Sequence, residues 1–269
     1  MEKDGVTPKE WLPECILPNF RPGTFWLSAR MFYMGIMLNA VGLSGPGARA
    51  LFVDGRWQER TEPFFLSFMS VAKTPEERLS ELREFITMLA LYLHGFSARI
   101  GLQINYSCPN VGLDPSCLVK EVETGLEIAG RLGIPLMPKF NILVPVAVAR
   151  EISKNPFCDA ICVSNTVPWG KIPDKINWER LFGSEVSPLA KFGGGGLSGR
   201  PLLPLVKTWV RRARHCGIVK PISVGGGILS PRDLDYLRTI DASSVFLGSV
   251  ATLRPWRVGR IIKEANELF

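Results

Sequence analysis

The stretch Lys220-Pro-Ile-Ser-Val-Gly-Gly-Gly-Ile-Leu229 decides the fold, because a short apolar strand runs directly into three consecutive glycines. Glycines allow the backbone to approach a ligand closely. A second glycine turn, Gly248-Ser249, ends the strand predicted over 244–248. In (β/α)8 barrels the loops after the last two strands frequently form a phosphate site. Two such turns at these places therefore favour a barrel with a phosphate site over two unrelated tight turns.

Strands and helices alternate from residue 64 to the end of the chain. Strands are predicted over 64–71, 99–106, 135–141, 159–165, 220–224 and 244–248. Helices are predicted over 74–93, 117–132, 145–154, 201–216, 231–239 and 258–268. The first helix begins with a capping box of Thr74 and Glu77. Alternation of this kind predicts a parallel sheet, and 269 residues suit one barrel, which typically needs about 250.

The charge of the chain favours anionic ligands over nucleic acid. The net charge is +7, and a basic balance attracts phosphates and carboxylates. The basic residues are scattered, however, and the densest cluster, Lys207 to Arg214, has the spacing of a solvated helix face. No basic stripe interleaved with aromatic residues is present in the sequence, so nucleic acid is not an expected partner.

The cysteines and apolar segments indicate a cytoplasmic protein. None of the six cysteines forms a C-x-x-C pair, which argues against a zinc or iron–sulfur site in this chain. The N-terminus opens with charged residues and has no apolar signal core. The apolar segment 31–43 is too short and too interrupted by glycine to span a bilayer. We therefore expect no metal and no membrane partner.

The segment Ile104-Asn-Tyr-Ser-Cys-Pro-Asn110 places a cysteine between two carboxamides at a predicted strand end. Carboxamides can form paired hydrogen bonds with the amide groups of a planar ligand. A thiolate there can accept a proton, as a general base does. On these residues alone, a buried Cys108 in a Pro-Asn turn is an equally good interpretation.

Other polar residues also lie in or at the ends of apolar segments and predicted strands. Asn39 follows an apolar segment, and Asn165 and Thr166 end a predicted strand, although each asparagine could simply form a turn. Lys139 interrupts the apolar strand 135–141. It is either a lysine whose amine reaches solvent or a charge partner for an anionic cofactor. We favour the cofactor, because this strand lies between the two strands that carry asparagine.

Taken together, these motifs resemble those of the dihydroorotate dehydrogenase family. Asn-x-Ser-Cys-Pro-Asn at 105–110 is similar to the active-site signature of the soluble members, and Asn39-Ala-Val-Gly-Leu43 to their carboxylate-binding loop. The lysine strand, Ser164-Asn-Thr166, the segment 194–199 and the two glycine turns follow in the family's order. The resemblance covers residue 36 to the C-terminus.

The resemblance implies a fold, a cofactor and a reaction. It implies a TIM (β/α)8 barrel that binds FMN and oxidises dihydroorotate to orotate. Cys108 would remove a proton from C5 while a hydride passes from C6 to flavin N5, and Lys139 would stabilise negative charge on the flavin. The implied cofactor-binding residues are Lys139, Gly199, Gly226, Gly227, Gly248 and Ser249. The implied substrate-binding residues are Asn39, Val41, Gly42, Leu43, Asn105, Asn110, Asn165 and Thr166.

The N-terminal part departs from the family pattern. An opening Asn-Pro strand and a second strand with a flavin-contacting lysine are both missing from the sequence. The family pattern Gly-Leu-x-Asn has an asparagine shortly after Gly-Leu, but here Ser44-Gly45 follow Gly42-Leu43. We therefore divide the chain into a divergent segment, 1–35, and an FMN-binding barrel domain, 36–269, and expect an incomplete N-terminal βα portion.

Two other functions remain open on the sequence. One is a related flavin ene-reductase that acts on another dihydropyrimidine or on dihydrouridine. The other is a barrel remnant that binds a phosphate ligand or a partner without turnover. The resemblance also implies a homodimer in many soluble members, and an electron acceptor that is fumarate, a quinone, or NAD reached through a partner subunit.

Overall fold

A six-stranded parallel sheet forms the larger part of the molecule in this computed structural model, which describes residues 13–42, 45–106 and 115–269. The strands run in the order β10-β9-β6-β5-β4-β3, and neighbours in this order pair in parallel. Their bounds are β3 Phe64–Phe68, β4 Ile100–Asn105, β5 Leu136–Phe140, β6 Ile161–Val163, β9 Ile222–Val224 and β10 Ser244–Val245. These are the six strands that the sequence predicted.

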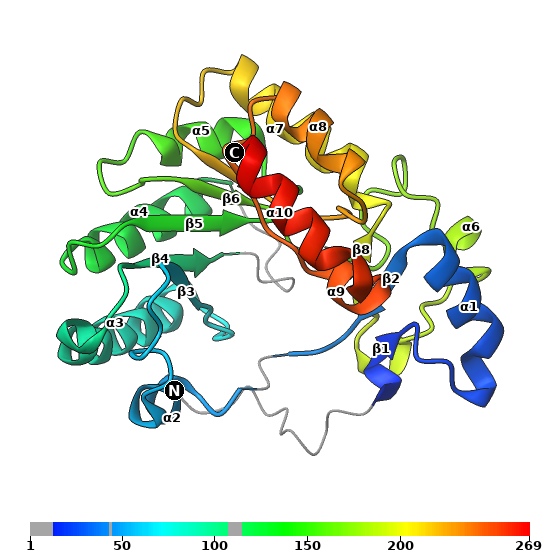
Figure 1. Ribbon diagram of the computed structural model, residues 1–269, viewed down its shortest axis with the longest axis horizontal. Helices are drawn as coiled ribbons and strands as arrows, with labels where there is room; N and C mark the ends of the chain where they lie inside the picture. Colours follow the sequence, from blue (N-terminus) through cyan, green and yellow to red (C-terminus); the bar gives the residue numbers. More distant parts are fainter. Residues whose placement is uncertain (1–12, 43–44, 107–114) are drawn as a thin grey trace.

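Helices cover the outer face of this sheet and curl with it (Figure 1). They are α3 Pro75–Tyr92, α4 Pro115–Gly130, α5 Val146–Ser153, α7 Leu202–His215, α8 Arg232–Thr239 and α10 Val258–Leu268. The predicted capping box of Thr74 and Glu77 is present at the start of α3. Apolar residues of these helices and of the strands form one continuous core, which includes Phe85, Leu126 and Val206.

The sheet forms an incomplete barrel. Among the described residues, no strand pairs with the outer edge of β3 or with that of β10. The predicted incomplete N-terminal βα portion is therefore confirmed. The short helix α2, Ala48–Asp54, precedes β3 and packs against α3.

A second sheet was not predicted from the sequence. Its four short strands have the order β1-β2-β8-β7, and neighbours in this order pair antiparallel. They are β1 Ile16–Leu17, β2 Ile36–Asn39, β7 Val167–Pro168 and β8 Gly196–Gly199, accompanied by α1 Phe25–Met34, α6 Trp178–Phe182 and, beside β2 and β8, α9 Ser249–Leu253. The sequence predicted no strand between 166 and 199, where the structure has β7 and β8. Strand β8 has two glycines in four residues and forms because β2 supplies its hydrogen-bond partners.

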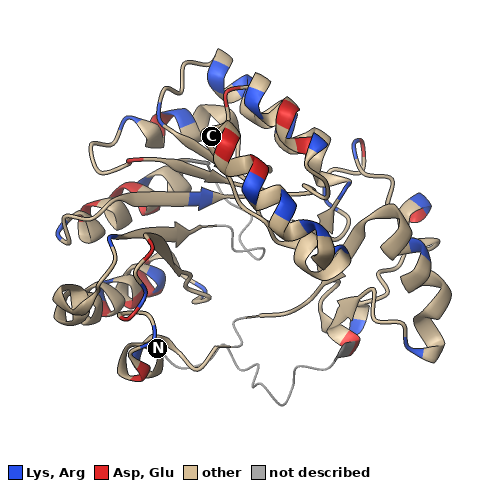
Figure 2. Cartoon of the chain, in the orientation of Figure 1, with Lys and Arg blue, Asp and Glu red and all other residues tan. Residues whose placement is uncertain are grey.

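Charged residues of both signs are interspersed along the outer helices in the view of Figure 2. On α7, Arg211 and Arg212 are exposed, as predicted for a solvated helix face. Arg214 differs, because its guanidinium donates to the carbonyls of Ile218 and Lys220 at 2.7 and 2.8 Å. It therefore ties the end of α7 to the start of β9. Within the described residues, no helix is long and apolar enough to cross a membrane.

Candidate active site

A cleft opens where the carboxyl ends of β5, β6, β9 and β10 meet the small sheet. In a parallel α/β sheet this edge is where ligands bind. Eight residues predicted for the site line the cleft: Asn39, Lys139, Asn165, Thr166, Gly226, Gly227, Gly248 and Ser249. They come from segments more than 200 residues apart in the sequence, and the fold brings them to one place.

The glycine turn after β9 is built so that side chains would not fit. Gly226 and Gly227 have φ angles of 112° and 80°, a region that favours glycine. A Cβ on Gly227 would lie 2.6 Å from the carbonyl oxygen of Gly199. Gly199 therefore packs behind the turn, and within the described part of the chain it is not one of the cleft-lining residues. Gly248 differs, because a Cβ there would meet nothing within 4 Å.

Asp233 braces the segment that follows the glycine turn. Its carboxylate accepts hydrogen bonds from the backbone N–H groups of Leu229 and Ser230, each at 2.9 Å. Its other oxygen lies 2.6 Å from Nη1 of Arg200. Burial raises the pKa of Asp233, but the Arg200 side chain and these N–H groups outweigh burial, so the pKa is lowered from its ordinary value.

We expect Asp233→Asn to destabilise the protein at neutral pH by about 1–3 kcal/mol, because a charged acceptor of buried donors is lost. The pKa of Asp233 is lowered in the folded state. Its contribution is therefore complete above the unfolded pKa of about 3.9 and is lost as pH falls through the folded pKa. Urea unfolding at pH 7 and at pH 3 checks this, since the gap between the two proteins should shrink at pH 3. An equal gap at both pH values would contradict it.

Lys139 places a positive charge in the cleft. It pairs in register with Asn105 on β4 and with Cys162 on β6. Its Nζ lies 4.8 Å from the centroid of the Phe246 ring. Burial raises the pKa of the Cys162 thiol to about 12, although the charge of Lys139 acts in the opposite direction. Cys162 is therefore a neutral neighbour of Lys139.

The carboxamide side of the cleft is formed by the end of β6 and by β2. The side chain of Asn165 accepts a hydrogen bond from the N–H of Thr166 at 2.8 Å, and Asn141 donates to the carbonyl of Thr166. These bonds fix the direction of Thr166 at the cleft wall. Asn39 ends β2 and lies opposite Gly196 in the register of the small sheet.

Several predicted residues are not among those that line this cleft. Asn105 lies beside Lys139 on the next strand, but it lines a different, small hollow and donates to Met69 Sδ at 3.3 Å. Val41 and Gly42 follow β2, and neither is a lining residue of the cleft in the described part of the chain. Three predicted residues, Leu43, Cys108 and Asn110, lie outside the described residues.

Sequence reasoning missed seven residues that also line the cleft: Met37, Ser164, Ser198, Leu202, Ile228, Phe246 and Leu247. Met37 could have been found, because residues two apart on a strand share a face, and Asn39 lies two positions later. Phe246 carried no such signal. Its ring packs against Gly225, where a Cβ would collide with it, and beneath Lys139.

The known proteins that resemble this chain in sequence or in structure are named as dihydroorotate dehydrogenases. No known protein-family model matches the sequence. The catalytic subunit of dihydroorotate dehydrogenase B (NAD(+)) from Caldicellulosiruptor bescii is 28% identical over 252 residues, which cover 88% of this chain and 73% of the relative. The corresponding subunit from Staphylococcus carnosus is 26% identical, with 86% of this chain and 72% of the relative covered. The crystal structure of dihydroorotate dehydrogenase from Eimeria tenella with ferulenol has a TM-score of 0.64 and 17% identity, covering 88% of this chain and 68% of that one.

Proposed function

We propose that this chain, which is similar to catalytic subunits of dihydroorotate dehydrogenase B, is a flavoprotein oxidoreductase that oxidises dihydroorotate to orotate with FMN. The observation that supports this most is the cleft itself. It combines two glycine turns, a lysine and a carboxamide-bearing strand end, which are the groups that FMN and a pyrimidine carboxylate require.

The residues present fit an anionic flavin. Gly226, Gly227 and Gly248 line the cleft, so a ligand there lies beside the backbone of both glycine turns, and a Cβ on Gly248 would face open space. Backbone N–H groups of this kind bind phosphate well. Lys139 lines the same cleft from β5, which β6 separates from β9, and its charge would balance a reduced flavin. FMN bound here would supply a two-electron acceptor for hydride.

The remaining chemistry falls to the chain's own groups. We propose that the thiolate of Cys108 takes the proton from C5 of dihydroorotate. Asn39, Asn165 and Thr166, with Asn105 and Asn110, would hold the pyrimidine by its amide groups. The backbone N–H groups of Val41, Gly42 and Leu43 would bind its carboxylate, as the likeness of Asn39 to Leu43 to the family's loop suggests.

The colour of the purified protein and one anaerobic experiment test the proposal. We expect a yellow protein with stoichiometric FMN whose flavin absorbance bleaches when dihydroorotate is added without oxygen. Bleaching by another dihydropyrimidine, and not by dihydroorotate, would favour the ene-reductase alternative. A colourless protein that takes up no added FMN would contradict the proposal and favour a remnant without turnover.

The relatives' names suggest what reoxidises the flavin. They describe catalytic subunits of NAD(+)-linked enzymes. We therefore propose that this chain, which lacks C-x-x-C pairs, passes its electrons to a partner subunit in the cytoplasm, and that it forms a homodimer. Measurement of reoxidation rates with fumarate, a quinone and NAD(+) separates these acceptors, and rapid turnover with fumarate alone would remove the need for a partner.

A further inference from the structure

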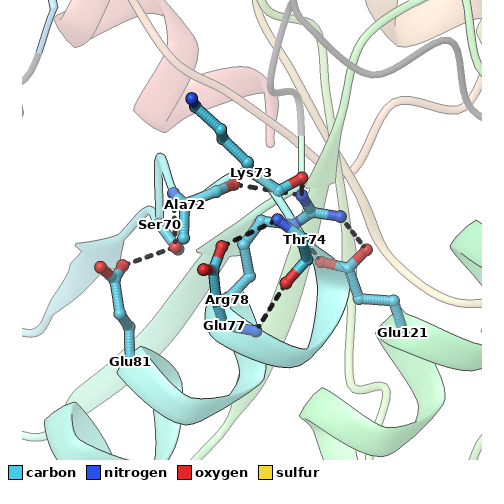
Figure 3. Close-up of polar contacts among 8 residues, drawn as sticks. All are labelled: Ser70, Ala72, Lys73, Thr74, Glu77, Arg78, Glu81 and Glu121. Atoms are coloured by element: carbon cyan, nitrogen blue, oxygen red, sulfur yellow. Dashed lines mark hydrogen bonds and ion pairs between the residues drawn. The ribbon is translucent and has the colours of Figure 1, made fainter.

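A buried ion pair joins α3 to α4 near the end of β4 (Figure 3). Arg78 and Glu121 are 7% and 6% exposed. Nε of Arg78 lies 2.7 Å from one carboxylate oxygen of Glu121, and Nη2 lies 2.7 Å from the other. This bidentate arrangement fixes the direction of both side chains as well as their separation.

The same guanidinium also holds the connection between β3 and α3. Its Nη1 donates to the carbonyl oxygens of Ala72 and Lys73 at 3.2 and 3.0 Å. The connection is braced further by Ser70, whose hydroxyl donates to Glu81 and accepts from the N–H of Ala72. Arg78 therefore links α4 to a segment that is itself held in place.

The ion pair borders the end of β4. A small hollow beneath it is lined by Ser70, Asn105 and Tyr106 as well as by both charged side chains. The hydroxyl of Tyr106 is buried and has no hydrogen-bond partner among the described residues. Burial and the charge of Glu121 raise the pKa of Tyr106, which stays neutral. A Cβ on Gly125 of α4 would collide with this hydroxyl, so α4 and the end of β4 are in close contact.

Stability does not account for such a pair. Removing two charges from water is expensive, and apolar residues of similar volume often stabilise a protein as well or better. Unlike an apolar contact, a bidentate pair fixes the relative direction of its two side chains. The geometry specified here is that of α4 and of the β3–α3 connection around the end of β4.

We propose that Arg78 and Glu121 are positioning residues for the oxidation of dihydroorotate. They fix Asn105, at the end of β4, relative to α4. This inference rests on the proposed function, in which Asn105 holds the substrate. Neither charged residue contacts the substrate, and both act through the residues at the end of β4.

The double variant R78M/E121L separates positioning from stability. We expect each single variant, R78M or E121L, to lower the melting temperature, because each leaves one buried charge unpaired. The double variant should recover most of that loss and keep its FMN. Flavin reduction at saturating dihydroorotate should nevertheless stay about tenfold or more slower than in the wild type, because small misplacements of reacting groups reduce rates strongly.

Hydrogen–deuterium exchange supplies a readout that does not depend on turnover. Exchange in peptides covering 100–106 and 115–121 should stay raised in the double variant, while peptides from β5 exchange as in the wild type. The matched control is Arg214→Met, which removes an arginine that also binds backbone carbonyls, at the opposite end of the sheet. It should lower the melting temperature and leave both the exchange in 100–106 and the rate per bound flavin unchanged.

A double variant with wild-type melting temperature, exchange and reduction rate would overturn the inference. If the double variant does not fold, Glu121→Gln decides the question by the same two measurements. This variant keeps one acceptor for Arg78 but replaces the other carboxylate oxygen with an amide donor, so the bidentate pair is lost. Wild-type exchange together with a wild-type rate would again overturn the inference. If dihydroorotate fails to reduce the wild-type flavin, the proposed function is wrong, while the exchange measurement still decides whether the pair fixes the end of β4.

Discussion

Replacing Cys108 with alanine is expected to slow reduction of the bound flavin by dihydroorotate about 100-fold or more, the usual scale for loss of a general base. The variant should keep FMN, because Gly226, Gly227 and Gly248 are untouched, and it should still bind orotate through the carboxamides. An unperturbed thiol has a pKa of about 8.5. The rate in the wild type should therefore rise with pH through the thiol's pKa. Stopped-flow reduction across pH measures both effects.

Cys108→Ser is the matched comparison for this experiment. A hydroxyl is a much weaker acid than a thiol, so this variant should retain activity only at high pH. If Cys108 merely packs under its loop, alanine would change the melting temperature and leave the reduction rate close to that of the wild type. That result would remove Cys108 from the chemistry while leaving the flavin site intact.

Gly248→Asp is expected to abolish FMN binding without unfolding the protein. A Cβ at Gly248 meets no atom within 4 Å, and Gly248 has no positive φ that a side chain would strain. The aspartate would nevertheless place a negative charge in the cleft beside Ser249, where we propose that the flavin phosphate binds. Flavin absorbance per protein after purification, together with the melting temperature of the apoprotein, measures the two effects.

The choice of glycine matters for this test. Gly227→Asp would force a Cβ against the carbonyl oxygen of Gly199, so a loss of flavin there would only report misfolding. Gly259→Asp is a suitable control, since Gly259 on α10 also has open space around its Cβ and is not one of the cleft-lining residues described. Full retention of FMN by the Gly248 variant would contradict the proposed phosphate site.

The parallel sheet could be predicted from the sequence because its signals are local. Each of the six strands is a short apolar run bounded by turn residues, and a helix pattern follows each of them before the next of these strands or the chain end. Glycine turns after β9 and β10 added a constraint on place, since ligand sites in such barrels lie at the carboxyl ends of the strands. Lys139, Asn165 and Gly226 were therefore expected together, and the fold brings them to one cleft.

The small sheet could not be predicted, because its strands depend on partners distant in the sequence. Leu38 pairs with Leu197, a separation that no local pattern reveals. The role of Arg78 was hidden for the same reason. On a helical wheel it is an ordinary charged residue of α3, and only the position of Glu121 on the next helix makes its burial possible.

The outer edge of β3 has a consequence for how the protein behaves at high concentration. This strand, Phe64-Phe-Leu-Ser-Phe68, carries no charge, and Phe65 is 47% exposed. An exposed apolar edge strand is a template for pairing with another chain. Residues that discourage such pairing precede it, namely Arg60, Glu62 and Pro63. If these three residues are replaced, we expect β3 strands of different molecules to pair and the protein to aggregate.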